Sequence, residues 1–311
     1  MHLADLPVIP LDGAPVEVAE ALGASFRRHG FALVGNHGIE PALTRQAWRL
    51  TRELFALPEN EKRQYFVAGI AGARGYTPFG SENAKGAALP DLKEFWHVGR
   101  ELPPGHPLTP SMPSNIWPER LAGFRETFLN LYRQFDTVGA VMLSRLALHL
   151  GLSPDWFEPA IADGNSVLRL LHYPPTTEAA EGAIRAGAHE DINLITLLLG
   201  AEEAGLELLG PAGEWLAVSP PEGALVVNIG DMLQRLTNHE LPSTTHRVRN
   251  PLSERADFSR YAMPFFLHPR GDFQIKTLRE CITRQNPDRF PLPIAADAYL
   301  QVRLKEIGLK Q

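Results

Sequence analysis

The sequence predicts an α+β fold with a mainly β core, a double-stranded β-helix or jelly roll. Helical patterns fill the first half of the chain, and short apolar segments follow in the second half, at residues 194–199, 215–218, 224–229 and 261–267. Gly, Pro, Asn or Glu bounds each segment, which is typical of antiparallel strands joined by turns. About four such strands separate His189 from His246, enough to bring both histidines to one end of a jelly roll.

The N-terminal region is predicted to be helical, with one early strand. Pro15 suits a first helical turn, apolar residues recur four apart as far as Phe26, and Gly30 ends this helix. A strand follows at residues 31–34. A second helix has an apolar face that consists of Leu43, Ala47, Leu50 and Leu54. Residues 67–117 are rich in Gly and Pro and are expected to be irregular, apart from a short strand at 94–98.

A long helix is predicted from Leu121 to Leu150, with Gly151 as its stop signal. Its apolar residues are three and four apart and form a narrow stripe, which could also indicate a coiled coil. Arg145 and His149 interrupt the heptad in the last turns. A single spine helix lying across a sheet is therefore the preferred interpretation.

A closing helix places four apolar residues on one face, namely Ala296, Leu300, Leu304 and Ile307. This face predicts packing against the body of the protein. The expected organisation is an N-terminal region of helices and irregular segments (1–117), the spine helix (118–155), the jelly-roll core (156–275) and a C-terminal helical region (276–311).

Composition argues against several classes of function. The 311 residues have a formal net charge of −6 and no run of Lys or Arg, which disfavours electrostatic binding to nucleic acid or an anionic membrane. No apolar stretch approaches the roughly 20 residues that span a bilayer, and the N-terminus lacks a secretory signal pattern. Cys281 is the only cysteine, so no intrachain disulfide can form. These features predict a cytoplasmic protein, and they leave its oligomeric state open.

His189, Asp191 and His246 form a candidate metal site. Alternate residues of a strand point to the same side, so His189 and Asp191 can bind one ion from a single strand end. Two imidazoles and one carboxylate can occupy one face of an octahedral iron(II) and leave the opposite face open. An open face admits a co-substrate and O2 together. The competing interpretation is a buried polar cluster with no metal.

An ordered set of motifs runs along nearly the whole chain: His29-Gly30-Phe31, Asn36-His37-Gly38-Ile39, Gly75-Tyr76-Thr77-Pro78, Lys93-Glu94-Phe95, Tyr173-Pro174-Pro175, His189-x-Asp191, Ile229-Gly230-Asp231-Met232, Ser243-Thr244-x-His246-Arg247-Val248 and Arg260-Tyr261-Ala262. In this order they resemble the isopenicillin N synthase-like branch of the iron(II)/2-oxoglutarate-dependent dioxygenases. The resemblance implies a jelly-roll enzyme that uses Fe(II), 2-oxoglutarate and O2. It also implies hydroxylation or desaturation of a small-molecule substrate, with succinate and CO2 as co-products.

The resemblance further implies a site for 2-oxoglutarate. Arg260 stands at the arginine position of the family's Arg-x-Ser motif, and its planar fork is expected to bind the far carboxylate. Tyr173, at the Tyr-Pro-Pro position, is the expected second donor. Two positions depart from the pattern: Ala262 replaces the serine, and Leu171 replaces the asparagine that often stands two residues before the tyrosine. We therefore expect weaker binding of 2-oxoglutarate or a reshaped pocket.

The substrate pocket of the resembled family lies between two aromatic positions. One is six residues past the arginine, here Phe266, and the other follows Lys93-Glu94, here Phe95. Phe265 and Phe266 point in opposite directions if they lie on a strand, and Phe266 is the one expected to face the cavity. An aromatic lining predicts a small, partly apolar or ring-bearing substrate.

Two alternatives remain open from sequence. Some members of the branch are oxidases that use O2 without 2-oxoglutarate and have the same triad and arginine motif, so Arg260 alone does not establish the co-substrate. The alternative from a different class is a jelly roll that binds a metal or small ligand without catalysis. Succinate formation from 2-oxoglutarate would distinguish a dioxygenase from both.

Overall fold

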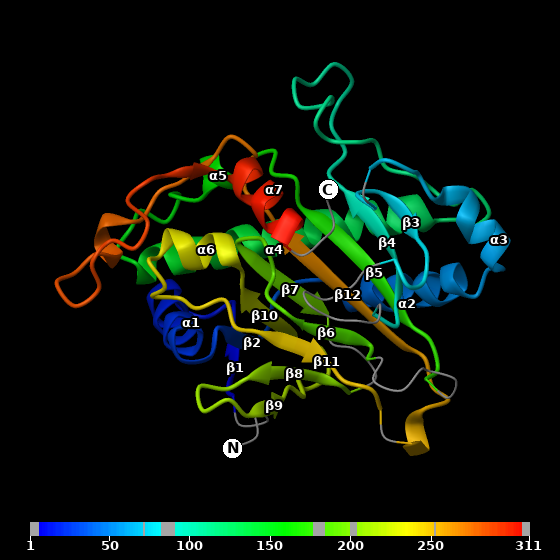
Figure 1. Ribbon diagram of the computed structural model, residues 1–311, viewed down its shortest axis with the longest axis horizontal. Coiled ribbons are helices and arrows are strands. Elements are labelled where there is room, and N and C mark those ends of the chain that lie inside the picture. Colours follow the sequence, from blue (N-terminus) through cyan, green and yellow to red (C-terminus); the bar gives the residue numbers. More distant parts are fainter. Residues whose placement is uncertain are drawn as a thin grey trace.

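A computed structural model describes residues 6–70, 72–81, 91–176, 184–199, 204–251 and 253–306 (Figure 1). Two β-sheets lie face to face at its centre, and helices cover the outer side of the larger sheet.

The elements follow one another in two groups. The N-terminal part contains β1 (Val8–Pro10), α1 (Pro15–His29), β2 (Phe31–Gly35), α2 (Pro41–Phe55), α3 (Glu59–Lys62), the 3-10 turn η2 (Arg63–Tyr65), β3 (Gly75–Thr77), β4 (Glu94–Gly99), α4 (Phe124–His149) and α5 (Glu158–Ile161). The C-terminal part contains β5 (Val167–Tyr173), β6 (Ala186–His189), β7 (Ile195–Leu199), β8 (Leu206–Leu209), β9 (Trp215–Ala217), β10 (Leu225–Ile229), α6 (Asp231–Leu236), β11 (His246–Val248), η3 (Ser253–Arg255), β12 (Arg260–Leu267), β13 (Gln274–Ile275), η4 (Arg279–Cys281), β14 (Ile294–Ala295) and α7 (Ala296–Glu306).

The predicted jelly roll is confirmed. Strands β10, β7, β12 and β5 form the centre of the larger sheet, and β6, β11, β8 and β9 form the smaller one. The larger sheet continues into β2 and β1 at one edge and into β4 and β3 at the other. The N-terminal region therefore supplies both edges of the sheet that carries the core.

Side chains alternate between the two faces of the larger sheet, as the period of a strand requires. On β12 the helix-facing set includes Phe265, whose ring lies 5.0 Å from that of Tyr132 and 5.3 Å from that of Phe135 on α4. Phe266 lies on the opposite face, toward the smaller sheet. The predicted directions of these two phenylalanines are therefore confirmed.

The spine helix α4 lies across the larger sheet and contacts β4, β7 and β12. Gly139 allows the close approach, because a Cβ there would lie 2.2 Å from Leu267 Cδ1. At its C-terminal end α4 instead meets α1, where the His149 ring lies against Gly23, which explains why the heptad fails there. The expected start at Leu121 is wrong: Gly123, with φ 76°, precedes the first helical residue.

The closing helix α7 packs on the core through Ala296, Tyr299 and Leu300. Leu304 is half-buried, and Ile307 lies outside the described residues. Each helix in the described ranges is too short or too polar to cross a membrane.

A buried ionic network ties α3 to the larger sheet. Glu94 on β4 accepts hydrogen bonds from Lys62 Nζ (2.7 Å), Tyr76 Oη (2.5 Å) and His172 Nδ1 (2.7 Å). Burial alone would raise the pKa of Glu94, but these three donors outweigh it and hold the pKa below its ordinary value. The ionised Glu94 carboxylate therefore stabilises the folded protein fully above the pKa of Glu94 in the unfolded chain, about 4.3. This stabilisation is lost as the pH falls through the lower pKa that Glu94 has in the folded protein.

Replacing Lys62 should leave the Glu94 carboxylate buried without its cation. We expect Lys62→Met to lower the free energy of unfolding by about 3 kcal/mol at neutral pH, and by less in acid, as measured by urea denaturation. The matched control is Arg49→Met, which breaks an exposed pair with Glu53 and should cost less than about 0.5 kcal/mol. Equal losses in the two variants would contradict a stabilising role for the network.

Candidate metal centre

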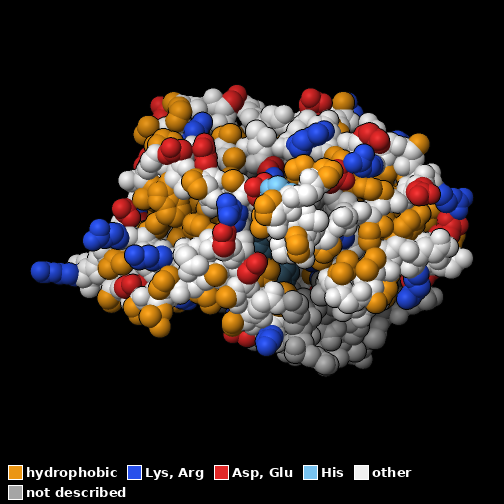
Figure 2. Space-filling model, turned by 90° about the horizontal axis from the view of Figure 1, so that it is seen from above, with side chains coloured by type: hydrophobic (Ala, Val, Ile, Leu, Met, Phe, Trp, Pro, Cys, Tyr) orange, Lys and Arg blue, Asp and Glu red, His pale blue; other side chains and the backbone are white. Residues whose placement is uncertain are grey.

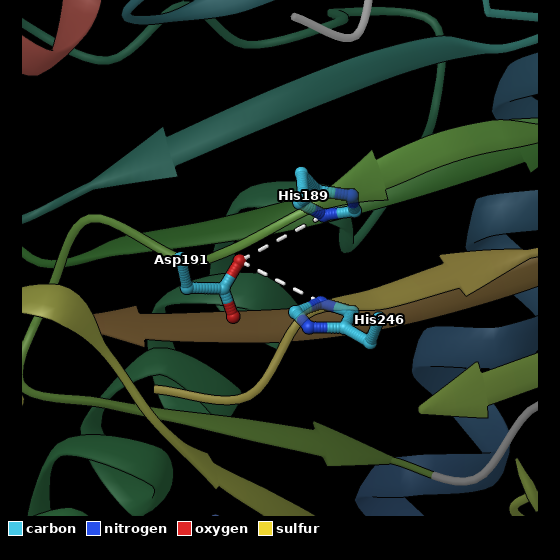
Figure 3. A group of neighbouring side chains, drawn as sticks. All are labelled: His189, Asp191 and His246. Atoms are coloured by element: carbon cyan, nitrogen blue, oxygen red, sulfur yellow. Dashed lines mark ion pairs between the residues drawn. The ribbon is translucent and has the colours of Figure 1, made fainter. Parts of the chain in front are cut away.

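The candidate ligands come from two paired strands of the smaller sheet. His189 ends β6, His246 begins β11, and the two residues are direct partners in the antiparallel register. Asp191 follows two residues after His189, on the segment that leads into β7. Figure 3 shows the three side chains pointing toward one another from these positions.

The three donor atoms lie close enough to share one ion. Asp191 Oδ1 is 3.9 Å from Nε2 of His189 and 3.9 Å from Nε2 of His246. One potential ligand atom from each residue lies within 4.8 Å of the others. The carboxylate and the two imidazoles therefore form a compact set of one oxygen and two nitrogens.

Backbone carbonyls orient both imidazoles. Nδ1 of His189 donates to Gly187 O at 2.7 Å, and Nδ1 of His246 donates to Thr244 O at 3.1 Å. Each Nδ1 then carries the proton, so each Nε2 presents a lone pair toward Asp191. This is the arrangement in which an imidazole ligates a metal and its second nitrogen is fixed by an outer partner.

Two polar side chains hold Asp191 in place. Thr196 Oγ1 and Asn228 Nδ2 both donate to Asp191 Oδ2, at 2.5 and 2.8 Å, and leave Oδ1 directed at the histidines. Burial would raise the pKa of Asp191, but the neighbouring histidines and these two donors hold it below its ordinary value. The carboxylate is thus ready to ligate in its charged form.

The His189 imidazole is held neutral. Burial, followed by the repulsion of His246, lowers the pKa of His189 to about 4. A neutral imidazole is the form that binds a metal. At neutral pH, His189 and Asp191 are therefore both in the protonation state that an ion requires.

The candidate ligands lie in the wall of a cavity between the two sheets, which opens to solvent. Figure 2 shows the molecule from above, where the surface is hollowed near its centre beside a histidine side chain. On this face Lys and Arg side chains are scattered among acidic and hydrophobic ones.

The cavity also contains most of the residues predicted for co-substrate and substrate. Arg260 and Tyr173 are cross-strand partners, both buried, and the Arg260 guanidinium lies 5.1 Å from the centre of the Tyr173 ring. Phe266 lines the cavity as well. Phe95 does not: it is 2% exposed and lies behind the wall, beneath the guanidinium of Arg169. The expectation that Phe95 itself faces the cavity is therefore wrong.

The two departures from the family pattern lie side by side. Leu171 on β5 is the direct partner of Ala262 on β12, and both line the cavity. They belong to an apolar cluster that includes Val248. One continuous apolar surface thus occupies the place where two polar contacts were expected.

Four functional candidates were missed from sequence. Thr196 and Asn228 support Asp191, and Lys93 and Arg169 line the cavity. A signal existed for the first two, because each is the polar residue within an otherwise apolar strand. Lys93 and Arg169 have no comparable local signal, since charged residues on strands are usually solvated.

Together the fold and the donor set define a class of protein. A jelly roll whose cavity wall presents two imidazoles and one carboxylate fits the facial triad of non-haem iron(II) oxygenases.

Comparison with known proteins agrees with this class. Residues 6–120 match a family described as non-haem dioxygenase in morphine synthesis N-terminal, and residues 164–269 match the 2OG-Fe(II) oxygenase superfamily. The chain is 32% identical to the 2-oxoglutarate-Fe(II) type oxidoreductase hxnY of Emericella nidulans, over 96% of the chain and 88% of that protein. It is 51% identical to a 2OG-Fe(II) oxygenase family protein from Caulobacter crescentus, with a TM-score of 0.90 and coverage of 97% and 99%. It is 29% identical to a full-length Neurospora crassa protein solved in complex with alpha-KG and thymine, with a TM-score of 0.85 and 96% of each chain covered.

The chain belongs to the 2OG-Fe(II) oxygenase superfamily. It is a non-haem dioxygenase that depends on iron(II), 2-oxoglutarate and O2. The oxidase without 2-oxoglutarate and the non-catalytic jelly roll, both left open by sequence, are therefore not favoured.

Glu190 links the segments that carry the candidate ligands. It lies between His189 and Asp191, and its Oε1 accepts a hydrogen bond from Thr245 Oγ1 at 2.6 Å, next to His246. Its Oε2 lies 3.4 Å from Arg303 Nη2 on α7. The closing helix is thus connected to the site through Glu190, and also through Asp231, which pairs with Arg303 Nη2 at 2.9 Å.

We expect Glu190→Ala to weaken iron(II) binding about tenfold without unfolding the protein. Glu190 holds the backbone segments that carry the candidate ligands, and contacts of this kind keep ligands in place. Anaerobic titration with Fe(II) measures this, and Glu190→Gln, which can still accept from Thr245, should restore most of the affinity. The control is Glu306→Ala, which removes an exposed partner of Arg303 and should leave iron affinity unchanged. Parental affinity in Glu190→Ala would refute this role.

Proposed function

We propose that His189, Asp191 and His246 hold the iron(II). In the same proposal, Arg260 and Tyr173 bind the 5-carboxylate of 2-oxoglutarate, and a small ring-bearing molecule is oxidised beside Phe266. The observation that carries the proposal is the shared cavity: its wall contains the three convergent donors, the buried guanidinium and the exposed face of Phe266.

The donor set supports the metal assignment. Bound iron(II) supplies O2 activation, which the side chains of this site cannot supply themselves. Hydrogen bonds from the outer partners direct Nε2 of each histidine and one oxygen of Asp191 toward one another, and such fixed donors favour metal affinity.

The cavity also supports the co-substrate assignment. 2-Oxoglutarate has two carboxylates, and a buried carboxylate without a partner is very costly. Arg260 is 3% exposed and offers a planar pair of donors, while the apolar surface of Leu171 and Ala262 covers the methylene carbons.

The proposed reaction is oxidation of a C–H bond. In a hydroxylation, substrate, 2-oxoglutarate and O2 give hydroxylated substrate, succinate and CO2, with one oxygen atom in each of the first two products. 2-Oxoglutarate supplies two electrons by losing CO2, and the C–H bond supplies the other two. Phe266 and the surrounding apolar residues position the substrate, since holding reactants in place is the main contribution of the protein.

The lining of the cavity favours a small, flat substrate, because Phe266, Pro264 and neighbouring apolar side chains form part of its wall. The similar Neurospora crassa structure holds thymine, a single flat ring. A ring of this kind can pack on Phe266.

Loss of one candidate ligand should abolish metal binding. We expect His246→Ala to weaken Fe(II) binding more than about a hundredfold. This loss should exceed the one caused by removing a residue that only hydrogen-bonds to a ligand, because the variant lacks a proposed ligand itself. The measurement is anaerobic titration together with the iron content of the purified protein. His239→Ala is the control, because this exposed imidazole stacks on Phe290 and lies outside the cavity lining. If His246→Ala held iron as the parent does, the assignment would be wrong.

The carboxylate site can be tested separately from the metal. We expect Arg260→Ala to raise the Kd of 2-oxoglutarate about ten- to a hundredfold, because a charge-assisted pair is lost. Iron binding should persist, and Ala262→Ser should leave the Kd equal or lower by restoring a donor. Calorimetry on the iron-loaded, oxygen-free protein measures both.

The control for this test is Arg247→Ala, which removes a guanidinium that packs on Trp215 and pairs with Glu207 outside the cavity. It should bind 2-oxoglutarate like the parent. An unchanged Kd of 2-oxoglutarate in Arg260→Ala would contradict the co-substrate assignment.

A further inference from the structure

A β-bulge on β6 brings His189 beside His246. Ala186 pairs with Val248 and His189 pairs with His246, so three residue steps on β6 match two steps on β11. One extra residue is therefore inserted in β6 between these pairs. In a regular register Ala188 would stand opposite His246, and the side chain of His189 would point to the other face of the sheet. Because of the bulge, His189 lines the cavity together with His246.

The carboxylate of Asp91 binds the bulge. A bulge interrupts the ladder of backbone hydrogen bonds, so the backbone groups within it need other partners. Gly187 lies inside the bulge, and its N–H donates to Asp91 Oδ1 at 2.9 Å. The second oxygen, Asp91 Oδ2, accepts from Lys93 Nζ at 2.8 Å. Asp91 is 6% exposed, so its carboxylate is a fixed acceptor at this point of β6.

The same glycine orients the imidazole of His189. Gly187 O accepts a hydrogen bond from His189 Nδ1 at 2.7 Å, so Gly187 connects Asp91 on one side with the imidazole on the other. A second contact fixes the strand nearby, because Leu92 N donates to Ile184 O at 3.0 Å. Residues 91–92 therefore run beside the segment that leads into the bulge and hold its backbone in place.

His189 depends on its backbone more than the other two candidate ligands do. Its side chain is 40% exposed, against 10% for His246 and 7% for Asp191. Two side-chain donors hold Asp191, and the Phe31 ring packs edge-on against His246 at 5.6 Å. The orientation of His189 instead comes from Gly187 O, within its own strand. A group that fixes the bulge therefore also fixes the position of this imidazole.

We propose that Asp91 is a positioning residue for the metal ligand His189, which it holds in place by stabilising the bulge at Gly187. The inference rests on the proposed function, because it concerns how the chain presents a proposed iron ligand. Asp91 lies outside the cavity lining and acts through one backbone N–H. Since Asp91 precedes β4 by three residues, the N-terminal region contributes to the metal site of the jelly roll.

Metal titration of Asp91 variants tests this role. The probes are Fe(II) in the absence of oxygen and Co(II), whose visible absorption spectrum reports the ligands around the ion. We expect Asp91→Ala to raise the Kd of both ions about ten- to a hundredfold, because the support of a ligand is lost. The Co(II) spectrum should change as well, because the imidazole of His189 is displaced from the ion.

Two conservative variants separate the hydrogen bond from the charge. Asp91→Asn still offers an oxygen to the Gly187 N–H and should recover most of the affinity and the parental Co(II) spectrum. Asp91→Glu keeps the charge beside Lys93 but moves the accepting oxygen by one methylene group, so it should bind both ions more weakly than Asp91→Asn. Both variants keep a polar side chain, so this comparison holds even where alanine prevents folding.

The matched control is Asp136→Ala, which removes the half-buried partner of Arg100 outside the cavity lining. It should lower the free energy of unfolding but leave both Kd values and the Co(II) spectrum at parental values. A double-mutant cycle tests whether Asp91 acts through His189. Asp91→Ala should cause no further loss of Co(II) affinity in a protein that already contains His189→Ala.

The outcomes separate this inference from the proposed function. Parental affinity and spectrum in Asp91→Ala overturn the inference, and so does an equal loss with and without His189→Ala. Tighter binding by Asp91→Glu than by Asp91→Asn also overturns it, because the charge rather than the hydrogen bond would then be responsible. If the parent bound neither ion, or if His246→Ala bound both as the parent does, the proposed function would fail instead.

Discussion

The alternation of side chains across the larger sheet is the constraint on which both the core and the site depend. Each central strand directs one row of residues at the helices and the other row into the cavity, so a single backbone serves stability and chemistry at once. Phe265 packs on α4 while Phe266 lines the cavity. A shift of one residue in register would exchange the two rows and destroy both. The buried network of Glu94 and the close approach at Gly139 hold that register from the helical side.

Features that depend on local periodicity could be predicted from the sequence. The spacing of His189 and Asp191, the directions of Phe265 and Phe266, and the strands β7, β9 and β10 before His246 all follow from a period of two and from turn residues. The short strand β8 and the helix α6 have too few residues for a pattern to stand out. The position of Phe95 could not be predicted either. It sits on the cavity side of β4, but the Arg169 guanidinium lies over its ring, and that contact joins residues far apart in sequence.

The pairing of Leu171 with Ala262 shows why isolated departures from a family pattern are hard to interpret. In sequence they are two separate losses of a polar group, ninety-one positions apart (262 − 171 = 91). In the structure they are one cross-strand contact, so each removes a partner that the other would have needed. A lone serine facing leucine would bury a hydroxyl against an apolar surface, whereas alanine facing leucine simply packs. The two replacements are thus physically consistent with each other.

The same register separates the two guanidiniums that line the cavity. Arg260 is the partner of Tyr173, and Arg169 lies four residues before Tyr173 on the same strand, about 13 Å along it. Thr196, which supports Asp191, is the partner of Phe266 at the opposite end of β12 from Arg260. Arg260 is buried, whereas Arg169 is half-buried. The register therefore holds the two guanidiniums apart along β5, which limits the repulsion between two cations that line the same cavity.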